Sequence, residues 1–123
     1  MQGRKRQYPE NNEQSALVEW FYVQFPNELI IKITNEGIRT MPQKMRWLKQ
    51  GGLPGAPDLF MPRANSKYYG LFIEMKPAKG GKAKENQKII IERLNQAGFL
   101  AIICHGFDAA KIQIENYLRN KNV

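Results

Sequence analysis

The sequence contains few of the residues that form covalent cross-links and metal clusters. Among its 123 residues there is one cysteine, Cys104, and one histidine, His105. A single cysteine excludes an internal disulfide framework and a zinc site made of four thiolates. No apolar run approaches the length of a membrane-spanning helix, and residues 1–14 lack the apolar stretch of a secretory signal. We therefore expect an intracellular protein without a membrane segment.

Acidic residues are also scarce, and this imbalance predicts the kind of partner. Lysine and arginine number 19 against 11 acidic residues, which gives a formal net charge of +8. Such a charge on a small domain favours a polyanion, most commonly nucleic acid, although a solvated lysine-rich surface is the simpler alternative. Twelve of the 19 basic residues fall in three groups: Arg4, Lys5 and Arg6; Arg39, Lys44, Arg46 and Lys49; and Lys76, Lys79, Lys82, Lys84 and Lys88.

The length and the apolar pattern predict one α/β domain over residues 1–123, with residues 1–9 as a basic tail. Helices are expected at residues 10–25, after Thr40, at residues 84–97, and after Asp108, which should cap a helix carrying Ile112, Tyr117 and Leu118. Strands are expected at residues 28–34, 58–61, 69–76 and 99–104, and the last, being continuously apolar, should be the most buried. This order predicts an α/β sandwich around a mixed sheet.

Three charged residues in the middle of the chain form the main candidate site. Side chains alternate along a strand, so Glu74 and Lys76 share one face, and Asp58 comes across from Glu74 if the strands at 58–61 and 69–76 pair as a hairpin. Two carboxylates held close together repel each other, and a divalent cation with oxygen ligands relieves this repulsion. The alternative is a surface Glu–Lys ion pair, which is worth about 0.5 kcal/mol.

The order and spacing of these motifs resemble a known nuclease family. The matching runs are G-A-P-D-L-F, then G-L-F-I-E-M-K, a basic stretch, a glutamine on the following helix, and G-F-L-A-I-I-C. Together they are similar to the VRR-NUC family of the PD-(D/E)xK nuclease superfamily, which includes small stand-alone domains of phages and bacteria. The resemblance implies a restriction-endonuclease-like core, with a mixed β-sheet flanked by helices.

The resemblance also implies roles for individual residues. Asp58 and Glu74 match the metal-binding carboxylates, and Lys76 matches the catalytic lysine that assists the attacking water. The main-chain carbonyl of Met75 is the expected further ligand of Mg²⁺ or Mn²⁺. Gln87 matches the glutamine that opens the helix after this strand in the family. The alternative is that Gln87 is an exposed helix glutamine with no role in the site.

The family places one more glutamate early in the first helix. Glu10, Gln14 and Leu17 fall on one helical face and match its E-x-x-x-Q pattern, so we assign Glu10, while Glu13 stays open as an alternative. His105 and Cys104 are expected to be structural.

The implied activity is metal-dependent endonucleolytic cleavage of DNA, with branched DNA such as a Holliday junction as the expected substrate. An RNA nuclease and an inactive nucleic-acid-binding module are the alternatives. The resemblance implies a bacterial or phage protein acting in the cytoplasm. It also implies a homodimer, which would account for Trp47, Leu48, Tyr68 and Tyr69 if they do not fill the core. The residues expected to bind phosphates are Arg39, Lys44, Arg46, Lys79, Lys82 and Lys84.

Overall fold

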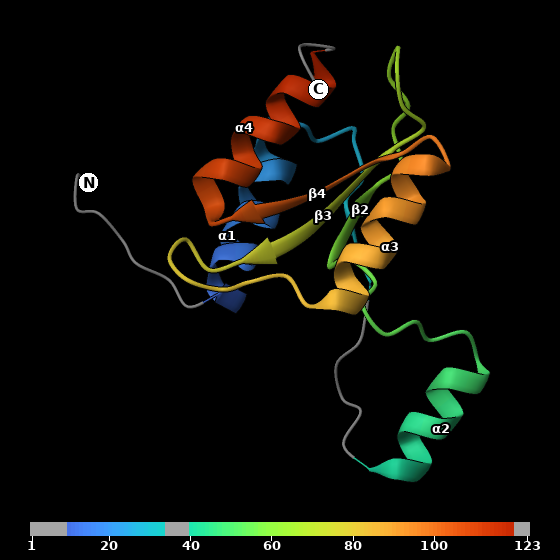
Figure 1. Ribbon diagram of the computed structural model, residues 1–123. Coiled ribbons are helices and arrows are strands. Elements are labelled where there is room, and N and C mark those ends of the chain that lie inside the picture. Colours follow the sequence, from blue (N-terminus) through green and yellow to red (C-terminus); the bar gives the residue numbers. More distant parts are fainter. Residues whose placement is uncertain (1–9, 34–39, 120–123) are drawn as a thin grey trace.

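The computed structural model describes residues 10–33 and 40–119, and it confirms the expected order of elements. The helices are α1 (Glu10–Gln24), α2 (Met41–Lys49), α3 (Glu85–Gln96) and α4 (Phe107–Leu118). The strands are β1 (Ile31–Lys32), β2 (Leu59–Met61), β3 (Leu71–Lys76) and β4 (Leu100–His105). Figure 1 shows α1 and α4 on one face of the sheet and α3 on the other, with α2 standing apart from this body.

The four strands form a mixed sheet in the order β1-β2-β3-β4. The β1–β2 and β2–β3 pairs are antiparallel, and β3 runs parallel to β4, so the α/β prediction is confirmed. The strand predicted at residues 28–34 is shorter than expected. Its partner β2 has only three residues, and the last bond of the pair runs from the Ile33 N–H to the carbonyl of Asp58, 2.8 Å away.

The core lies between the sheet and the pair of helices α1 and α4. Leu71, Ile73 and Met75 alternate along β3 and point into this core. They pack in one cluster with side chains one helical turn apart in α1 and on the inner face of α4: Leu17, Phe21, Ala110, Ile114 and Tyr117. Burial of the odd-numbered positions of β3 leaves Glu74 and Lys76 together on the opposite face.

The prediction that the strand at residues 99–104 would be the most buried was wrong. β4 lies at the edge of the sheet and is only partly buried, whereas the central strand β3 is buried at five of its six positions. Asn95 of α3 covers part of the open edge of β4: its amide accepts from the Ala101 N–H at 2.8 Å and donates to the Ala101 carbonyl at 3.3 Å. A continuous apolar run therefore did not distinguish an edge strand from a central one.

The start of the last helix also differs from prediction. Gly106, not Asp108, is its N-cap residue, and Asp108 lies in the first turn. Ile112 is exposed, because the buried face of α4 consists of Ala110, Ile114 and Tyr117. The helix begins earlier than expected because the chain turns sharply at Gly106, whose φ of 91° is in the region that favours glycine.

Candidate active site

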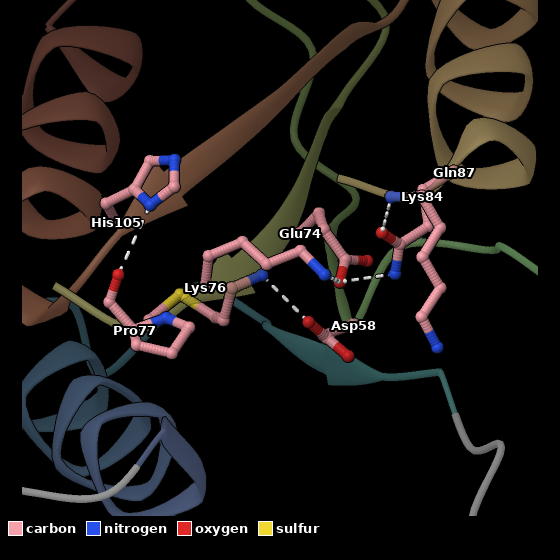
Figure 2. Close-up of polar contacts among 8 residues, drawn as sticks. Asp58, Glu74, Lys76, Pro77, Lys84, Gln87 and His105 are labelled. Atoms are coloured by element: carbon pink, nitrogen blue, oxygen red, sulfur yellow. Dashed lines mark hydrogen bonds and ion pairs between the residues drawn. The ribbon is translucent and has the colours of Figure 1, made fainter. Parts of the chain in front are cut away.

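The site forms at the end of β3, where the hairpin register brings Asp58 next to Glu74. Leu59 pairs with Ile73, so the following position of the antiparallel ladder places Asp58 opposite Glu74. The carboxylate of Asp58 is fixed by the main chain of β3, since its Oδ2 accepts a hydrogen bond of 2.7 Å from the Met75 N–H. Figure 2 shows Asp58, Glu74, Lys76 and Gln87 gathered at this strand end. The predicted hairpin thus brings the two carboxylates together.

Glu74 and Lys76 are buried, which excludes the alternative of an exposed ion pair. Their relative exposures are 4% and 8%, and Lys76 Nζ lies 3.6 Å from Glu74 Oε2. Charged side chains are rarely buried in a small domain unless they are paired, because desolvation disfavours the charged form. A buried Glu–Lys pair of this kind points to a functional site more than to stabilisation of the fold.

The Glu74 carboxyl group is only partly satisfied by the protein. Its Oε2 accepts from Gln87 Nε2 at 3.0 Å, while Oε1 is buried and has no hydrogen-bond partner. Burial, followed by the nearby charge of Asp58, raises the pKa of Glu74 to about 7, and Lys76 opposes this rise. A buried carboxylate oxygen without a partner, beside a second carboxylate, is suited to binding a cation.

Gln87 connects the start of α3 to this carboxylate. Its side-chain Oε1 accepts from the main-chain N–H of Lys84 at 2.8 Å, and its Nε2 donates to Glu74. Both halves of the amide are therefore used, and the side chain is half-buried. This geometry excludes the alternative of an exposed helix glutamine, and it makes Gln87 a residue that orients Glu74.

The oxygen-rich donor set fits a hard divalent cation such as Mg²⁺ or Mn²⁺. The Lys76 carbonyl points towards β4, where it accepts from the Gly106 N–H at 2.9 Å. Carbonyl groups alternate in direction along a strand, so the Met75 carbonyl points the other way, towards Asp58. Among the side chains that the structure describes, which do not include that of Glu10, no group of three or more Asp, Glu, His or Cys suited to a metal is found. Protein ligation there would come from two carboxylates and one carbonyl.

The structure describes the side chain of only one of the two candidate glutamates of the first helix. Glu10 is the first residue of α1, and its side chain lies outside the part that the structure describes. Glu13 is already used within the fold, since its Oε1 accepts a 3.0 Å hydrogen bond from the Phe107 N–H at the start of α4. Nothing in the sequence predicted this contact across 94 positions. The assignment of Glu10 as the further ligand stays a prediction.

The predicted phosphate-binding residues that the structure describes lie on two segments, the connection that follows β3 and helix α2. Lys79, Lys82 and Lys84 are exposed in the connection between β3 and α3, and Lys44 and Arg46 are exposed on α2. Arg39 lies outside the described residues, as do residues 1–9. Lys49 was not among the predicted phosphate-binding residues, but it is also exposed, in the last turn of α2.

Comparison with known proteins identifies a family and two solved structures that are similar to this chain. The model of the VRR-NUC domain matches residues 3–108, most of the chain. This chain belongs to the VRR-NUC family. A solved structure titled "VRR_NUC domain protein" superposes with a TM-score of 0.79 at 25% sequence identity, covering 93% of this chain and 91% of the other. A second, titled "VRR_NUC domain", gives a TM-score of 0.59 at 24% identity, covering 88% and 96%, and supports the fold alone.

Among curated protein sequences, none matches this VRR-NUC chain. VRR-NUC is a nuclease domain family, and its members generally use divalent metals and bind DNA. The family match and the fold confirm the resemblance that the motifs suggested. In the described part of the chain, no helix has both the length and the apolar character required to cross a membrane.

Proposed function

We propose that this VRR-NUC domain is a metal-dependent DNA endonuclease that acts on branched DNA, with a four-way junction as the substrate to test first. The observation that carries the proposal is the buried Glu74–Lys76 pair, which lies beside Asp58 and leaves one Glu74 oxygen without a partner. A binding module without turnover has no need to bury a lysine against a carboxylate that lacks a full set of partners.

Asp58, Glu74 and the Met75 carbonyl would hold Mg²⁺ or Mn²⁺, with Glu10 as a further ligand. A divalent ion bound there lowers the pKa of water and neutralises charge that develops on the phosphate oxygens. Gln87 keeps Glu74 oriented, and the Asp58–Met75 hydrogen bond keeps the two carboxylates in register. Lys76 contributes a positive charge and hydrogen-bond donors, which orient the attacking water or stabilise the phosphate oxygens.

DNA binding is proposed to come mainly from phosphate contacts on both sides of the site. The exposed lysines after β3 and the basic side chains of α2 are point charges that position a backbone without reading bases. The segment from Gly37 to Pro57 contains basic residues and no acidic residue. A steep decrease in affinity with salt is therefore expected.

We also propose that the domain acts as a homodimer, because two equivalent strands of a junction require two sites in matching geometry. Met41, Met45 and Leu48 form an exposed apolar stripe along α2, and α2 packs against no other described helix or strand. The stripe is the proposed contact with a second copy. Of the aromatic residues expected at a dimer interface, Tyr69 is exposed. Trp47 lies against Gly52 of its own loop and Tyr68 packs on the core, so these two fit a dimer contact less well.

The test is a cleavage assay on linear, flapped and four-way DNA, and on matched RNA, with Mn²⁺, Mg²⁺ or EDTA. We expect paired nicks in the four-way junction that require metal and disappear in Lys76→Ala. Cleavage in EDTA, or full activity in Lys76→Ala, would refute the proposed metal-dependent mechanism. Binding without cleavage would favour the inactive module, and preferential cleavage of RNA would favour the RNA nuclease.

A separate experiment addresses the dimer. Light scattering at micromolar concentration is expected to give twice the 14.2 kDa chain mass for the wild type and a monomer for Met45→Asp. Ile112→Asp serves as the control, since it places the same charge at an exposed apolar position on α4, away from the α2 stripe. A wild-type monomer that nicks one strand only would refute the dimer.

A further inference from the structure

The turn between β4 and α4 holds the main chain that follows the catalytic lysine. The Lys76 carbonyl accepts from the Gly106 N–H at 2.9 Å, which is the last main-chain bond between the parallel strands. The next residue, Pro77, has no N–H. Its carbonyl has a side-chain contact, since Nδ1 of the His105 imidazole lies 3.2 Å from the oxygen (Figure 2).

This turn is itself held at a fixed distance from α1. Glu13 of α1 accepts from the Phe107 N–H at 3.0 Å and so caps α4, whose N-cap residue Gly106 has no side chain to do so. A Cβ at Gly106 would lie 3.0 Å from Ala78 Cβ and 3.1 Å from Glu13 Oε1, so only glycine allows this close approach at a φ of 91°.

Packing alone does not fix the turn. A cavity of about 330 Å³ lies beside it, lined by Glu13, Ala16, Ala78, His105, Gly106, Phe107 and Asp108. Because no side chain of the described residues fills this space, the hydrogen bonds to the Pro77 carbonyl and from the Phe107 N–H help to determine where the backbone after Lys76 lies. Small displacements of a reacting group are costly in catalysis, since a shift of about 1 Å can reduce the rate on the order of 100-fold.

We propose that His105 is a positioning residue for Lys76: its Nδ1–H holds the Pro77 carbonyl and thereby fixes the strand end from which Lys76 extends to Glu74. The proposal rests on the nuclease function proposed above. A carbonyl oxygen is only an acceptor, so the ring nitrogen facing it carries the proton. The neutral ring is therefore the Nδ1–H tautomer, and its Nε2 is an acceptor.

The kinetic test compares His105→Ala with His105→Asn on four-way DNA under saturating Mn²⁺. The amide nitrogen of asparagine stands close to where Nδ1 stands, so this variant keeps the donor. We expect His105→Ala to lower kcat about tenfold with KM within about twofold of the wild type, and His105→Asn to recover most of the loss. Asp108→Asn, in the same turn but without a contact to Pro77, is the matched control and should behave as the wild type.

Several results would overturn the proposal. Wild-type kcat in His105→Ala, or equal losses in the alanine and asparagine variants, would remove the positioning role. A change confined to KM would make His105 a DNA contact instead. If thermal unfolding shows that His105→Ala has lost its fold, the asparagine variant still tests the proposal. A kcat of His105→Asn well below the wild-type value would then contradict the positioning role.

A second measurement does not depend on cleavage. His105 is the only histidine of the chain, so ¹⁵N NMR of the untagged protein shows one pair of ring nitrogens. The Nδ1–H tautomer is expected for the neutral ring, and a dominant Nε2–H tautomer would show that the Pro77 contact is not made. If the wild-type protein fails to cleave any substrate, the proposed function fails, while the tautomer still decides the His105 contact.

Discussion

The end of β3 and helix α2 are held in opposite ways. At the end of β3 every functional side chain has a defined contact: Asp58 with the Met75 N–H, Glu74 with Gln87, and Lys76 with Glu74. Helix α2, joined to Asp58 by residues 50–57, has no buried residue. A nine-residue helix is marginal by itself, and its Thr40–Gln43 capping box is its main local support.

This difference separates two tasks of a nuclease. Hydrolysis of a phosphodiester requires groups fixed to a fraction of an ångström, which a central strand of the core provides. Contact with the phosphate backbone depends on charge and tolerates variation in position. If this division is correct, substitutions at the end of β3 should abolish the reaction at little cost in binding, and substitutions on α2 should do the reverse.

The largest effect is expected from Asp58→Asn. The amide keeps an oxygen for the Met75 N–H, so the fold should survive, but the negative charge needed for the cation is lost. We expect cleavage to fall by about 1000-fold or more, with a Tm within a few degrees of the wild type. Single-turnover cleavage and thermal unfolding measure the two quantities, and a Mn²⁺-binding titration should show weaker binding. Activity within tenfold of the wild type would show that Asp58 is not a ligand.

A smaller loss is expected at the start of α1. If Glu10 completes the ligand set, Glu10→Gln should reduce kcat about 50-fold. Glu13→Gln should have little effect, because the amide oxygen can still accept from the Phe107 N–H. The two variants form a matched pair assayed at several Mn²⁺ concentrations. The reverse ranking would place the catalytic glutamate one helical turn further along α1.

The raised pKa of Glu74 predicts a stability that decreases with pH when metal is absent. The folded protein binds a proton at Glu74 up to pH about 7, whereas an ordinary carboxyl group loses it near 4.5. Stability from this group is therefore full below pH 4.5 and is lost as pH rises to 7, by on the order of 2 kcal/mol.

Urea unfolding in EDTA at pH 5 and pH 8 measures this change, with Glu74→Gln as the reference that cannot ionise. The wild type should lose more stability than the variant between the two pH values, and Mn²⁺ should restore part of it at pH 8. Equal pH dependence in both proteins would show that the Glu74 pKa is not raised.

Gln87→Ala should give an intermediate effect, because the residue contacts Glu74 and not the substrate. Losing the Nε2–Glu74 bond leaves the carboxylate free to turn, and we expect kcat to fall about tenfold. Gln96→Ala, on the exposed end of the same helix, is the control and should match the wild type. A loss of DNA affinity without a change in kcat would instead place Gln87 on the phosphate backbone.

The smallest effects should come from α2, and they should appear in binding. Lys44→Ala and Arg46→Ala are each expected to weaken DNA binding about threefold at moderate salt and to reduce the salt slope by about 1. Lys67→Ala, in the connection at the other end of β3, is the control. A tenfold loss of kcat at constant affinity in either α2 variant would contradict the division between the two regions.

The sequence allowed prediction of most of the site because its geometry follows from local periodicity. Alternation along residues 69–76 and a hairpin with residues 58–61 were sufficient to place Asp58, Glu74 and Lys76 together. The helix at α2 was also predictable, since Thr40, Pro42 and the following glycines mark its ends. The parts that were wrong depend on tertiary position: an apolar strand does not show whether it lies at an edge, and the local pattern around Asp108 does not reveal the turn at Gly106.

Contacts between distant segments could not be predicted at all. The bond from the Phe107 N–H to Glu13 joins residues 94 positions apart, and the contact of His105 with the Pro77 carbonyl depends on how β4 meets the end of β3. Neither residue type nor spacing predicts such bonds, because the polar side chains of Glu13 and His105 could equally well be exposed to solvent.

The pairing of Asn95 with Ala101 has a consequence for how this protein behaves at high concentration. β4 is a six-residue strand at the border of the sheet, apolar except for His105, and is the kind of segment on which other chains can assemble into aggregates. By taking both the donor and the acceptor of Ala101, the Asn95 amide occupies a position where a foreign strand would begin to attach. One asparagine on α3 thus blocks part of the sheet edge on which copies of this VRR-NUC domain could otherwise pair.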